Sequence, residues 1–221
     1  MTLSATNAGG TGHASLTLTI TTVVIVSSVQ AIAQAASSPA KTLSLSFPAN
    51  TAAGDLILVA FDYDTNALPT SVADSQGNVF TEVGTQLNSP GGARSRVYYA
   101  KKIKGGADTV TVTLSANSAW LEVYLSEYSG VDQVNPIDAQ IGATGNAGAV
   151  SSGNATTTVA GDVIYGFCLA DSTCTVGSGF AARSTLNNNL IEDKTAGAPG
   201  SYATTGTANN GWTMQLVALR P

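Results

Sequence analysis

Two segments of this 221-residue chain carry nearly the same phrase. Residues 53–61 read AGDLILVAF and residues 160–168 read AGDVIYGFC, so an Ala-Gly-Asp turn leads into an apolar run each time. A short apolar run bounded by turn residues is typical of a buried β-strand. A weaker similarity links WLEVYL at 120–125 with WTMQLV at 212–217. The repeat predicts two related halves built from the same strand pattern.

Turn residues divide the rest of the chain into short strands. DSQGN at 74–78, GG at 105–106 and NNG at 209–211 separate runs rich in Val, Thr and Tyr. No stretch of helical periodicity exceeds two turns. We therefore expect an all-β fold, a jelly-roll or Greek-key β-sandwich of two related halves with an extra N-terminal strand. Strands are expected at 23–30, 41–47, 55–62, 70–73, 79–83, 94–103, 108–114, 119–128, 155–159, 162–169, 179–185, 201–207 and 212–219.

The segment at 141–154 is rich in Gly, Ala and Ser and separates the two halves. It could be a linker between domains or the long crossover of a Greek key. A half of about 80–100 residues with one sheet could not bury both faces, so we favour the crossover. This interpretation gives one sandwich domain over 23–221, with halves of about 23–140 and 141–221. Residues 1–22 form a separate N-terminal strand segment.

The composition excludes some classes of partner. Only 10% of the residues are charged and the net charge is −5, which argues against nucleic acid because phosphate binding needs clustered Lys and Arg. We interpret the basic cluster KKIK at 101–104 as a solvated strand end and turn rather than as a binding patch. No run approaches the ~18 apolar residues of a membrane span. The apolar run within 21–36 has no basic residue before it and is interrupted by polar ones, so we interpret it as a strand rather than a signal peptide.

The chain has two cysteines, Cys168 and Cys174. If the residues between them form a hairpin loop, the two thiols lie across from each other and can form a disulfide. The alternative is two free, half-buried thiols. A disulfide would indicate an oxidising compartment, which the acidic, Thr-rich composition also favours. A Cys/His metal site is disfavoured because the single histidine, His13, is distant in sequence.

Five segments carry a family resemblance: AGDLILV at 53–59, TSVADSQGN at 70–78, YYAK at 98–101, GGADTVTV at 105–112 and EYSG at 127–130. On these segments the chain, from about residue 26 to 220, resembles β-sandwich modules that recur in large secreted bacterial proteins. Through SATNAGGTG at 4–12 and LTI at 18–20, residues 4–20 resemble the last strands of an immunoglobulin-like repeat. The resemblance implies an extracellular or cell-surface location, a sandwich fold and a multidomain or polymeric context, and it carries no catalytic residues to transfer.

A strand before the main domain is the first candidate for function. Residues 15–21 alternate strictly, which places Leu16, Leu18 and Ile20 on one face. This strand could pair with its own sandwich, stay disordered, or insert into the sheet of a neighbouring subunit as a donor strand. Insertion would make a head-to-tail contact and hence a homopolymeric filament.

An acidic segment after the first repeat is a candidate Ca²⁺ site. Asp62, Asp64 and Asn66 alternate, so three side-chain oxygens could converge, with Asp74 and Asn78 as further ligands if the loops meet. The alternative is Asx-turn chemistry closing a loop, which we favour because no glycine-anchored calcium loop follows. No other cofactor is expected.

Aromatic residues line one face of the strand at 119–128. Trp120, Glu122 and Tyr124 share that face, and aromatic rings beside a carboxylate suit sugar stacking and hydrogen bonding. The alternative, which we favour, is that the aromatics fill the core while Glu122 lies at an edge.

A catalytic carboxylate pair is hard to assemble from the sequence. Glu122 and Glu127 are five residues apart and lie on opposite faces, while nothing places Glu82 or Glu192 beside either of them. We therefore expect a non-catalytic extracellular structural or adhesive protein that assembles with itself or with neighbouring modules. The alternatives are a polysaccharide-binding module and, less favoured, a glycoside-active enzyme.

Overall fold

The structure is a computed structural model that describes residues 3–14 and 24–221. An antiparallel hairpin of β1 (Leu3–Asn7) and β2 (Gly10–Ala14) occupies the first of these ranges. The proposed assembly strand with Leu16, Leu18 and Ile20 lies outside the described residues, so strand exchange stays a prediction. The chain over 24–221 is built of β-strands in antiparallel sheets, which confirms the expected all-β sandwich.

The N-terminal half contains two sheets. In the larger sheet, β5 is central and lies between β10 and β8, with β3 and β7 at the edges. A smaller sheet has β9 between β4 and β6. The strand bounds are β3 (Ser27–Ala35), β4 (Ala40–Ser46), β5 (Leu56–Tyr63), β6 (Pro69–Asp74), β7 (Thr81–Asn88), β8 (Arg94–Ala100), β9 (Thr109–Ser118) and β10 (Leu121–Ser129).

The C-terminal half repeats this design with a reduced outer layer. Its five-stranded sheet has the order β11-β19-β14-β16-β15, and two short pairs, β12–β18 and β13–β17, form the outer layer. The bounds are β11 (Ile137–Gly145), β12 (Gly148–Ser151), β13 (Ala155–Thr156), β14 (Val163–Ala170), β15 (Ala181–Ser184), β16 (Leu190–Thr195), β17 (Ser201–Tyr202), β18 (Thr205–Ala208) and β19 (Trp212–Leu219). A 3₁₀ turn, η1 (Leu186–Asn188), precedes β16.

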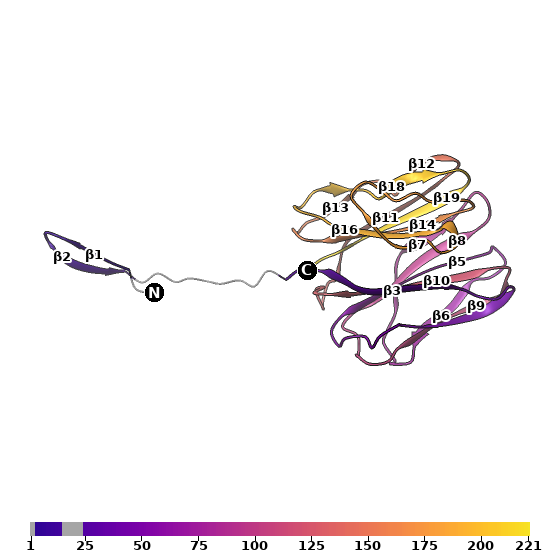
Figure 1. Ribbon diagram of the computed structural model, residues 1–221, viewed down its shortest axis with the longest axis horizontal. Coiled ribbons are helices and arrows are strands. Elements are labelled where there is room, and N and C mark those ends of the chain that lie inside the picture. The colour runs from indigo at the N-terminus through magenta and orange to yellow at the C-terminus, as the bar shows by residue number, and fades with distance from the viewer. Residues whose placement is uncertain (1–2, 15–23) are drawn as a thin grey trace.

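The two five-stranded sheets pack face to face, so the domain has four layers (Figure 1). Alternate residues of β5 face opposite ways: Leu56 and Leu58 enter the core between the halves, while Ile57 and Val59 enter the core inside the N-terminal half. Strands covered on both faces read as continuous apolar runs, because both sets of side chains are buried. The repeated phrase is therefore the sequence of the central, doubly covered strand of each half.

The halves are related by an approximate two-fold axis that runs along the strands. β3, β10, β5, β8 and β7 correspond in order to β11, β19, β14, β16 and β15. The sheets stack in opposite order, with β7 against β11 and β3 against β15. Each Ala-Gly-Asp turn has its glycine in the left-handed region, with φ +94° at Gly54 and +86° at Gly161. The repeat thus corresponds to an internal pseudo-dimer.

The similarity between the two tryptophan segments is displaced by one residue. Leu121 pairs with Tyr63 at the end of β5, whereas Trp212 pairs with Ala170 at the equivalent end of β14. Trp212 therefore corresponds to Leu121 and lies in the core, while Trp120 is 38% exposed. The two tryptophans are not equivalent.

Two expectations about segments are wrong. The proposed crossover at 141–154 instead contains most of β11 and all of β12, since Ala139, Ile141 and Ala143 point into the C-terminal cores and give the segment a strand alternation of small residues. Each half also supplies its own outer layer rather than one sheet, which buries the second face of that sheet. The strand β16 was not expected at all.

Candidate functional site

An open pocket of about 230 Å³ lies where the two halves meet, at the C-terminal ends of β5 and β14. The N-terminal half provides one side of this pocket from β5 and β10, and the C-terminal half provides the other from the loops after β14 and around η1. Pockets between packed halves are common binding sites because several elements converge there. The polar and aromatic residues that line it are Asp62, Trp120, Glu122, Asp171, Ser172 and the three asparagines at 187–189.

Glu122 is the hub of the pocket floor. Its Oε1 accepts a hydrogen bond of 2.6 Å from Nδ2 of Asn187. Its Oε2 accepts one of 2.6 Å from the Tyr124 hydroxyl and one of 3.0 Å from Nδ2 of Asn189. Asn189 is itself oriented by the backbone, because its Oδ1 accepts the Ala170 amide at 3.0 Å. The carboxylate is therefore held by donors from both halves of the chain.

Asp62 forms a second carboxyl group beside Glu122. The two residues are direct partners across β5 and β10, and both lie on the face toward the C-terminal half. Directly opposed side chains have Cβ atoms about 5 Å apart. Burial, and then the charge of Glu122, raise the pKa of Asp62 well above its ordinary value. The Asp62 carboxyl is thus biased toward its neutral, hydrogen-bond-donating form.

Tyr124 lies beneath the pocket and is not available for stacking on a ligand. It is 1% exposed, and its ring contacts Phe167 of the other half with centroids 5.2 Å apart. Burial, and then the nearby Asp62 and Glu122, raise its pKa, so the hydroxyl stays protonated and donates to Glu122. Of the three candidate sugar-binding residues, Trp120 and Glu122 line the pocket, whereas Tyr124 lies in the core, as the favoured alternative expects, and supports the pocket floor.

The C-terminal half lines the pocket with two short loops, one after β14 and one around η1, and contacts of the backbone and side chains restrict both. Asn187 and Asn188 have φ of +49° and +69°, a left-handed conformation that Asn tolerates better than most residues. Asp171 approaches the β7–β8 loop, where Ser89 Oγ donates to its Oδ2 at 3.1 Å. A Cβ at Gly91 would lie 1.8 Å from that oxygen, so any larger residue there would displace the Asp171 carboxylate. Loops from both halves thus lock together at the pocket.

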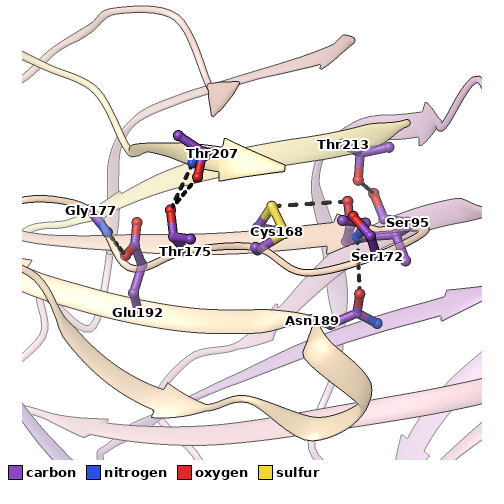
Figure 2. Close-up of a disulfide and its surroundings, with 12 residues drawn as sticks. Ser95, Cys168, Ser172, Thr175, Gly177, Asn189, Glu192, Thr207 and Thr213 are labelled. Atoms are coloured by element: carbon purple, nitrogen blue, oxygen red, sulfur yellow. Dashed lines mark hydrogen bonds between the residues drawn. A yellow bond between two sulfur atoms is a disulfide. The ribbon is translucent and has the colours of Figure 1, made fainter. Parts of the chain in front are cut away.

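The predicted disulfide between Cys168 and Cys174 is confirmed (Figure 2). It connects the end of β14 to the segment that contains Thr175, whose N–H donates to the Thr207 carbonyl at 3.1 Å. This segment lies beside β18 as β6 lies beside β9 in the other half. In the N-terminal half this place is held by β6, a regular strand of the outer sheet. In the C-terminal half the disulfide holds it instead, and with it the pocket wall that begins at Asp171.

Replacing both cysteines by serine is expected to lower the free energy of unfolding by about 2–3 kcal/mol, the closure entropy of so short a loop. Urea denaturation followed by tryptophan fluorescence measures the change. Thr173→Ala, at an exposed position inside the same loop, is the control and should leave the urea midpoint close to that of the wild type. An unchanged midpoint in the double variant would show that the hydrogen bonds of Thr175 hold the segment without the disulfide.

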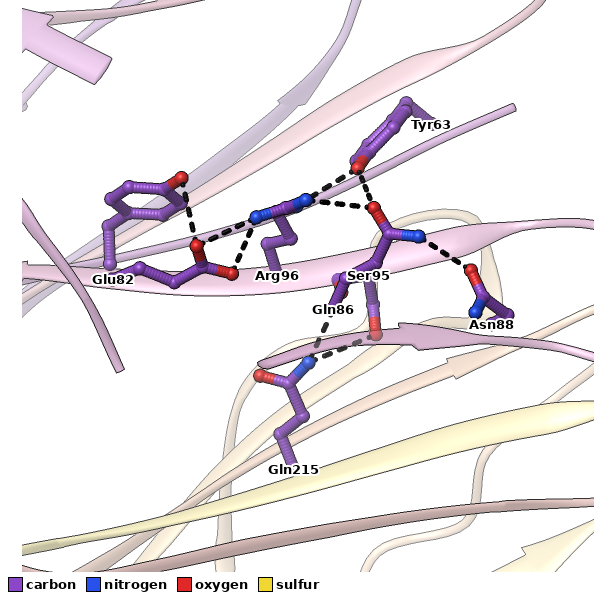
Figure 3. Close-up of polar contacts among 8 residues, drawn as sticks. Tyr63, Glu82, Gln86, Asn88, Ser95, Arg96 and Gln215 are labelled. Atoms are coloured by element: carbon purple, nitrogen blue, oxygen red, sulfur yellow. Dashed lines mark hydrogen bonds and ion pairs between the residues drawn. The ribbon is translucent and has the colours of Figure 1, made fainter. Parts of the chain in front are cut away.

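A second polar cluster occupies the position related to the pocket by the pseudo-two-fold axis. Strand register makes Ser95, Thr213 and Gln215 the counterparts of Asn189, Glu122 and Tyr124. The hydrogen bonds correspond as well: Ser95 Oγ lies 2.7 Å from Thr213 Oγ1, and Gln215 Nε2 donates to the Ser95 carbonyl at 3.2 Å (Figures 2 and 3). Asp62 corresponds to Leu169. The carboxyl groups of Asp62 and Glu122 therefore occur at only one of the two positions that the pseudo-two-fold axis relates.

The Ca²⁺ candidates do not converge. Oδ1 of Asp64 accepts the Asn66 amide at 2.7 Å, and its Oδ2 accepts the Ala119 amide, which is the Asx-turn alternative. Asp62 instead faces Asn189, whose Nδ2 is 3.4 Å from its Oδ1. Asp74 is bonded to Asn78 at its own turn. Among the described residues there is no group of three or more His, Cys, Asp or Glu side chains placed to hold a metal.

The other acidic candidates lie in separate networks. Glu82 pairs with Arg96 at 2.7 Å, and Arg96 also donates to Tyr63 and Gln86 (Figure 3). Glu127 accepts Gln30 and the Ala52 amide. Glu192 accepts the Gly177 amide at 2.8 Å (Figure 2). None of the three joins Glu122, whose carboxyl partner is Asp62.

Sequence reasoning missed the contribution of the C-terminal half to the pocket. Asn187, Asn189 and Asp171 lie in what the sequence presents as loops, and the only local signal is the run of three asparagines at 187–189. Comparison of the chain with protein-family models, with curated proteins and with solved structures gives no match. Among the described residues there is no helix long and apolar enough to cross a membrane.

Proposed function

We propose that this protein is a non-catalytic extracellular module that binds neutral polysaccharide in the pocket beside Trp120. The observation that carries the proposal is an exposed tryptophan at the mouth of a pocket whose floor combines amides with carboxyl groups. An indole ring offers an apolar face to a sugar ring, and amide and carboxyl groups match its hydroxyls. Adhesion to a glycan surface is the role that such a module would serve.

The hydrogen bonding around Glu122 favours binding over catalysis. Both of its oxygens already accept hydrogen bonds from Asn187, Tyr124 or Asn189. A glycosidase needs one carboxyl group free to protonate the leaving oxygen and another free to attack or to activate water. Asp62, 1% exposed, lies too deep for direct contact with a polymer chain. The carboxyl pair therefore serves to position the amide groups of Asn187 and Asn189, which line the pocket.

An extracellular location agrees with the covalent structure. The disulfide between Cys168 and Cys174 forms and persists in oxidising compartments. The polar surface depends on hydroxyl and amide groups, since only 10% of the residues are charged. Such a surface suits neutral partners such as glycans better than it suits polyelectrolytes.

Binding of the protein to neutral polysaccharides such as cellulose, xylan and dextran tests the proposal. Affinity electrophoresis should show retardation by at least one of them, and Trp120→Ala should weaken binding by about tenfold or more, as expected for a central aromatic contact. Val134→Ala changes another exposed apolar residue away from the pocket and should bind as the wild type does. Retardation that is absent, or equal for Trp120→Ala and wild type, would overturn the proposal.

A further inference from the structure

A second pocket, of about 300 Å³, lies at the opposite end of the β5 sheet from Trp120. It is formed where the chain leaves β8 and where the turn between β6 and β7 passes beside it. We call it the lysine pocket. The residues that define it are Asn78, Val79, Tyr99, Lys101, Lys102 and Lys104.

The lysine pocket gathers three of the nine Lys and Arg residues of an acidic chain. Elsewhere, Arg96, Arg183 and Arg220 are paired with carboxylates. Within 24–221, none of the three lysines forms such an ion pair. The ammonium groups of Lys101 and Lys104 instead donate to backbone carbonyls. Among residues 24–221, the ammonium group of Lys102 has no hydrogen-bond partner. The pocket therefore has an excess of positive charge that the protein does not neutralise.

The backbone that carries these lysines is anchored. Ile103 is 2% exposed, its N–H donates to the Asp55 carbonyl at 3.0 Å, and its carbonyl accepts the Gly54 amide at 2.9 Å. Lys102, directly before it, has a left-handed φ of +51°, an uncommon conformation for a non-glycine residue. These constraints direct the side chains that flank Ile103 outward from a fixed strand end.

Lys104 is oriented further by the neighbouring turn. Its Nζ donates to the carbonyls of Gln76 at 3.0 Å and of Gly77 at 3.3 Å. Gly77 has a left-handed φ of +70°, which fixes the turn whose carbonyl faces the ammonium group. An ammonium group has three N–H donors, so one remains for a ligand. A second ligand contact is available from the unpartnered Lys102.

An apolar surface adjoins the positive charge. Val79 is 82% exposed and lines the same pocket as Tyr99. The volume is at the lower end of the range for small-molecule sites, roughly 300–1,000 Å³. This combination matches a compact group that has both an anionic oxygen substituent and a ring with an apolar face.

We propose that the lysine pocket binds an acidic saccharide, with its carboxylate or sulfate group held by Lys102 and Lys104 and its ring against Val79 and Tyr99. A lipid surface is disfavoured, because a membrane would bring many anionic groups against a chain whose net charge is −5, whereas one acidic saccharide unit needs only the lysines of this pocket. The inference uses no residue of the Trp120 pocket and stands independently of the function proposed there.

Affinity electrophoresis at low salt with polygalacturonate, dextran sulfate and neutral dextran tests this inference, with phosphatidylglycerol vesicles as a separate arm in a flotation assay. The triple variant Lys101→Gln, Lys102→Gln and Lys104→Gln removes both ligand contacts and the third charge of the pocket, so it should bind the acidic polysaccharide about tenfold more weakly. Lys41→Gln removes one exposed charge on β4 and serves as the control. Trp120→Ala should leave this binding unchanged.

Retardation by polygalacturonate or dextran sulfate that is lost in the triple variant, kept in Lys41→Gln and Trp120→Ala, and weakened by salt supports the site. Three results would overturn it. The wild type could bind neither acidic polysaccharide, the Lys41→Gln control could lose as much affinity as the triple variant, or the vesicles could bind as tightly as the polysaccharides. Loss of neutral-polysaccharide binding alone would concern only the Trp120 pocket.

Discussion

Asp193→Ala is expected to destabilise the protein by about 2–3 kcal/mol, because it leaves the buried Tyr128 hydroxyl without its acceptor and removes the ion-pair partner of the more exposed Arg183. Asp193 lies on β16, is 4% exposed, and accepts the Tyr128 hydroxyl at 2.7 Å across the interface between the halves. It also pairs with Arg183 through two hydrogen bonds of 2.8 Å. The buried Asp193 carboxylate thus joins three strands, β10, β15 and β16, from both halves.

Chemical denaturation should show this loss as a lower midpoint for Asp193→Ala. Asp193→Asn keeps the shape and one acceptor, so its loss should be smaller. Asp132→Ala is the control, since Asp132 lies in an exposed turn and bonds only local amides. A loss below about 1 kcal/mol for Asp193→Ala would show that the stacked apolar faces alone hold the halves together.

The central strands could be predicted because burial on both faces left a pattern that periodicity detects. The residues of β5, β14, β10 and β19 are apolar or aromatic at most positions, and turns bound them. β16 has the sequence LIEDKT and was missed, because consecutive charged residues suggest a loop. Glu192 and Asp193 are nevertheless buried, since Gly177 and Arg183 supply their partners from elsewhere in the chain. Such tertiary compensation leaves no local signal.

Some residues of the candidate site could likewise be predicted from the sequence, and others could not. Trp120 and Glu122 could be found from the alternation of one strand, and Asp62 from its position at the end of the repeat. The sequence could not show which of these residues contact each other, because the pairing of Asp62 with Glu122 depends on the register between β5 and β10. Asn187 and Asn189 reach the pocket through β16, which was itself unrecognised. A site between two halves needs the stacking of sheets that local sequence does not encode.

The pseudo-two-fold axis relates the pocket to a second position in the interface between the halves. Two equivalent places at one end of the interface hold corresponding hydrogen bonds, one through Ser95 and Thr213 and the other through Asn189 and Glu122. Short neutral side chains fill the first place. In the second, carboxyl groups and a pocket replace them. The larger pocket and the carboxyl groups therefore occur at only one of the two positions, although the backbone frame is shared.

The protein is expected to be more stable near pH 5 than near pH 8, with Tm falling on the order of 5 °C between them. Burial, and then Glu127, raise the pKa of Asp55 to about 6. Burial, and then Asp138, raise the pKa of Asp162 to about 7, and burial raises that of Glu192 to about 7. In the unfolded chain such groups titrate near pH 4.

The sign follows from the protons that each state holds. Between about pH 4 and 7 the folded protein retains protons that the unfolded chain has released, so this part of the stability is complete below pH 4 and is lost as the pH rises through the folded pKa values. Scanning calorimetry at both pH values measures the slope. Asp162→Asn should flatten it by raising Tm at pH 8, whereas Asp132→Asn should not, since the pKa of Asp132 is already lowered by hydrogen bonds from the Asn135 and Val134 amides.

A Tm that is constant or rises from pH 5 to 8 would contradict this expectation. The two aspartates concerned are the third residue of each Ala-Gly-Asp phrase, Asp55 and Asp162, and each lies against a second carboxyl group, Glu127 in one half and Asp138 in the other. The second acid comes from β10 in one case and from β11 in the other. Since the partner differs while the aspartate recurs, the turn rather than the pair fixes the aspartate in its buried position, and the pH dependence follows from the geometry of the repeat.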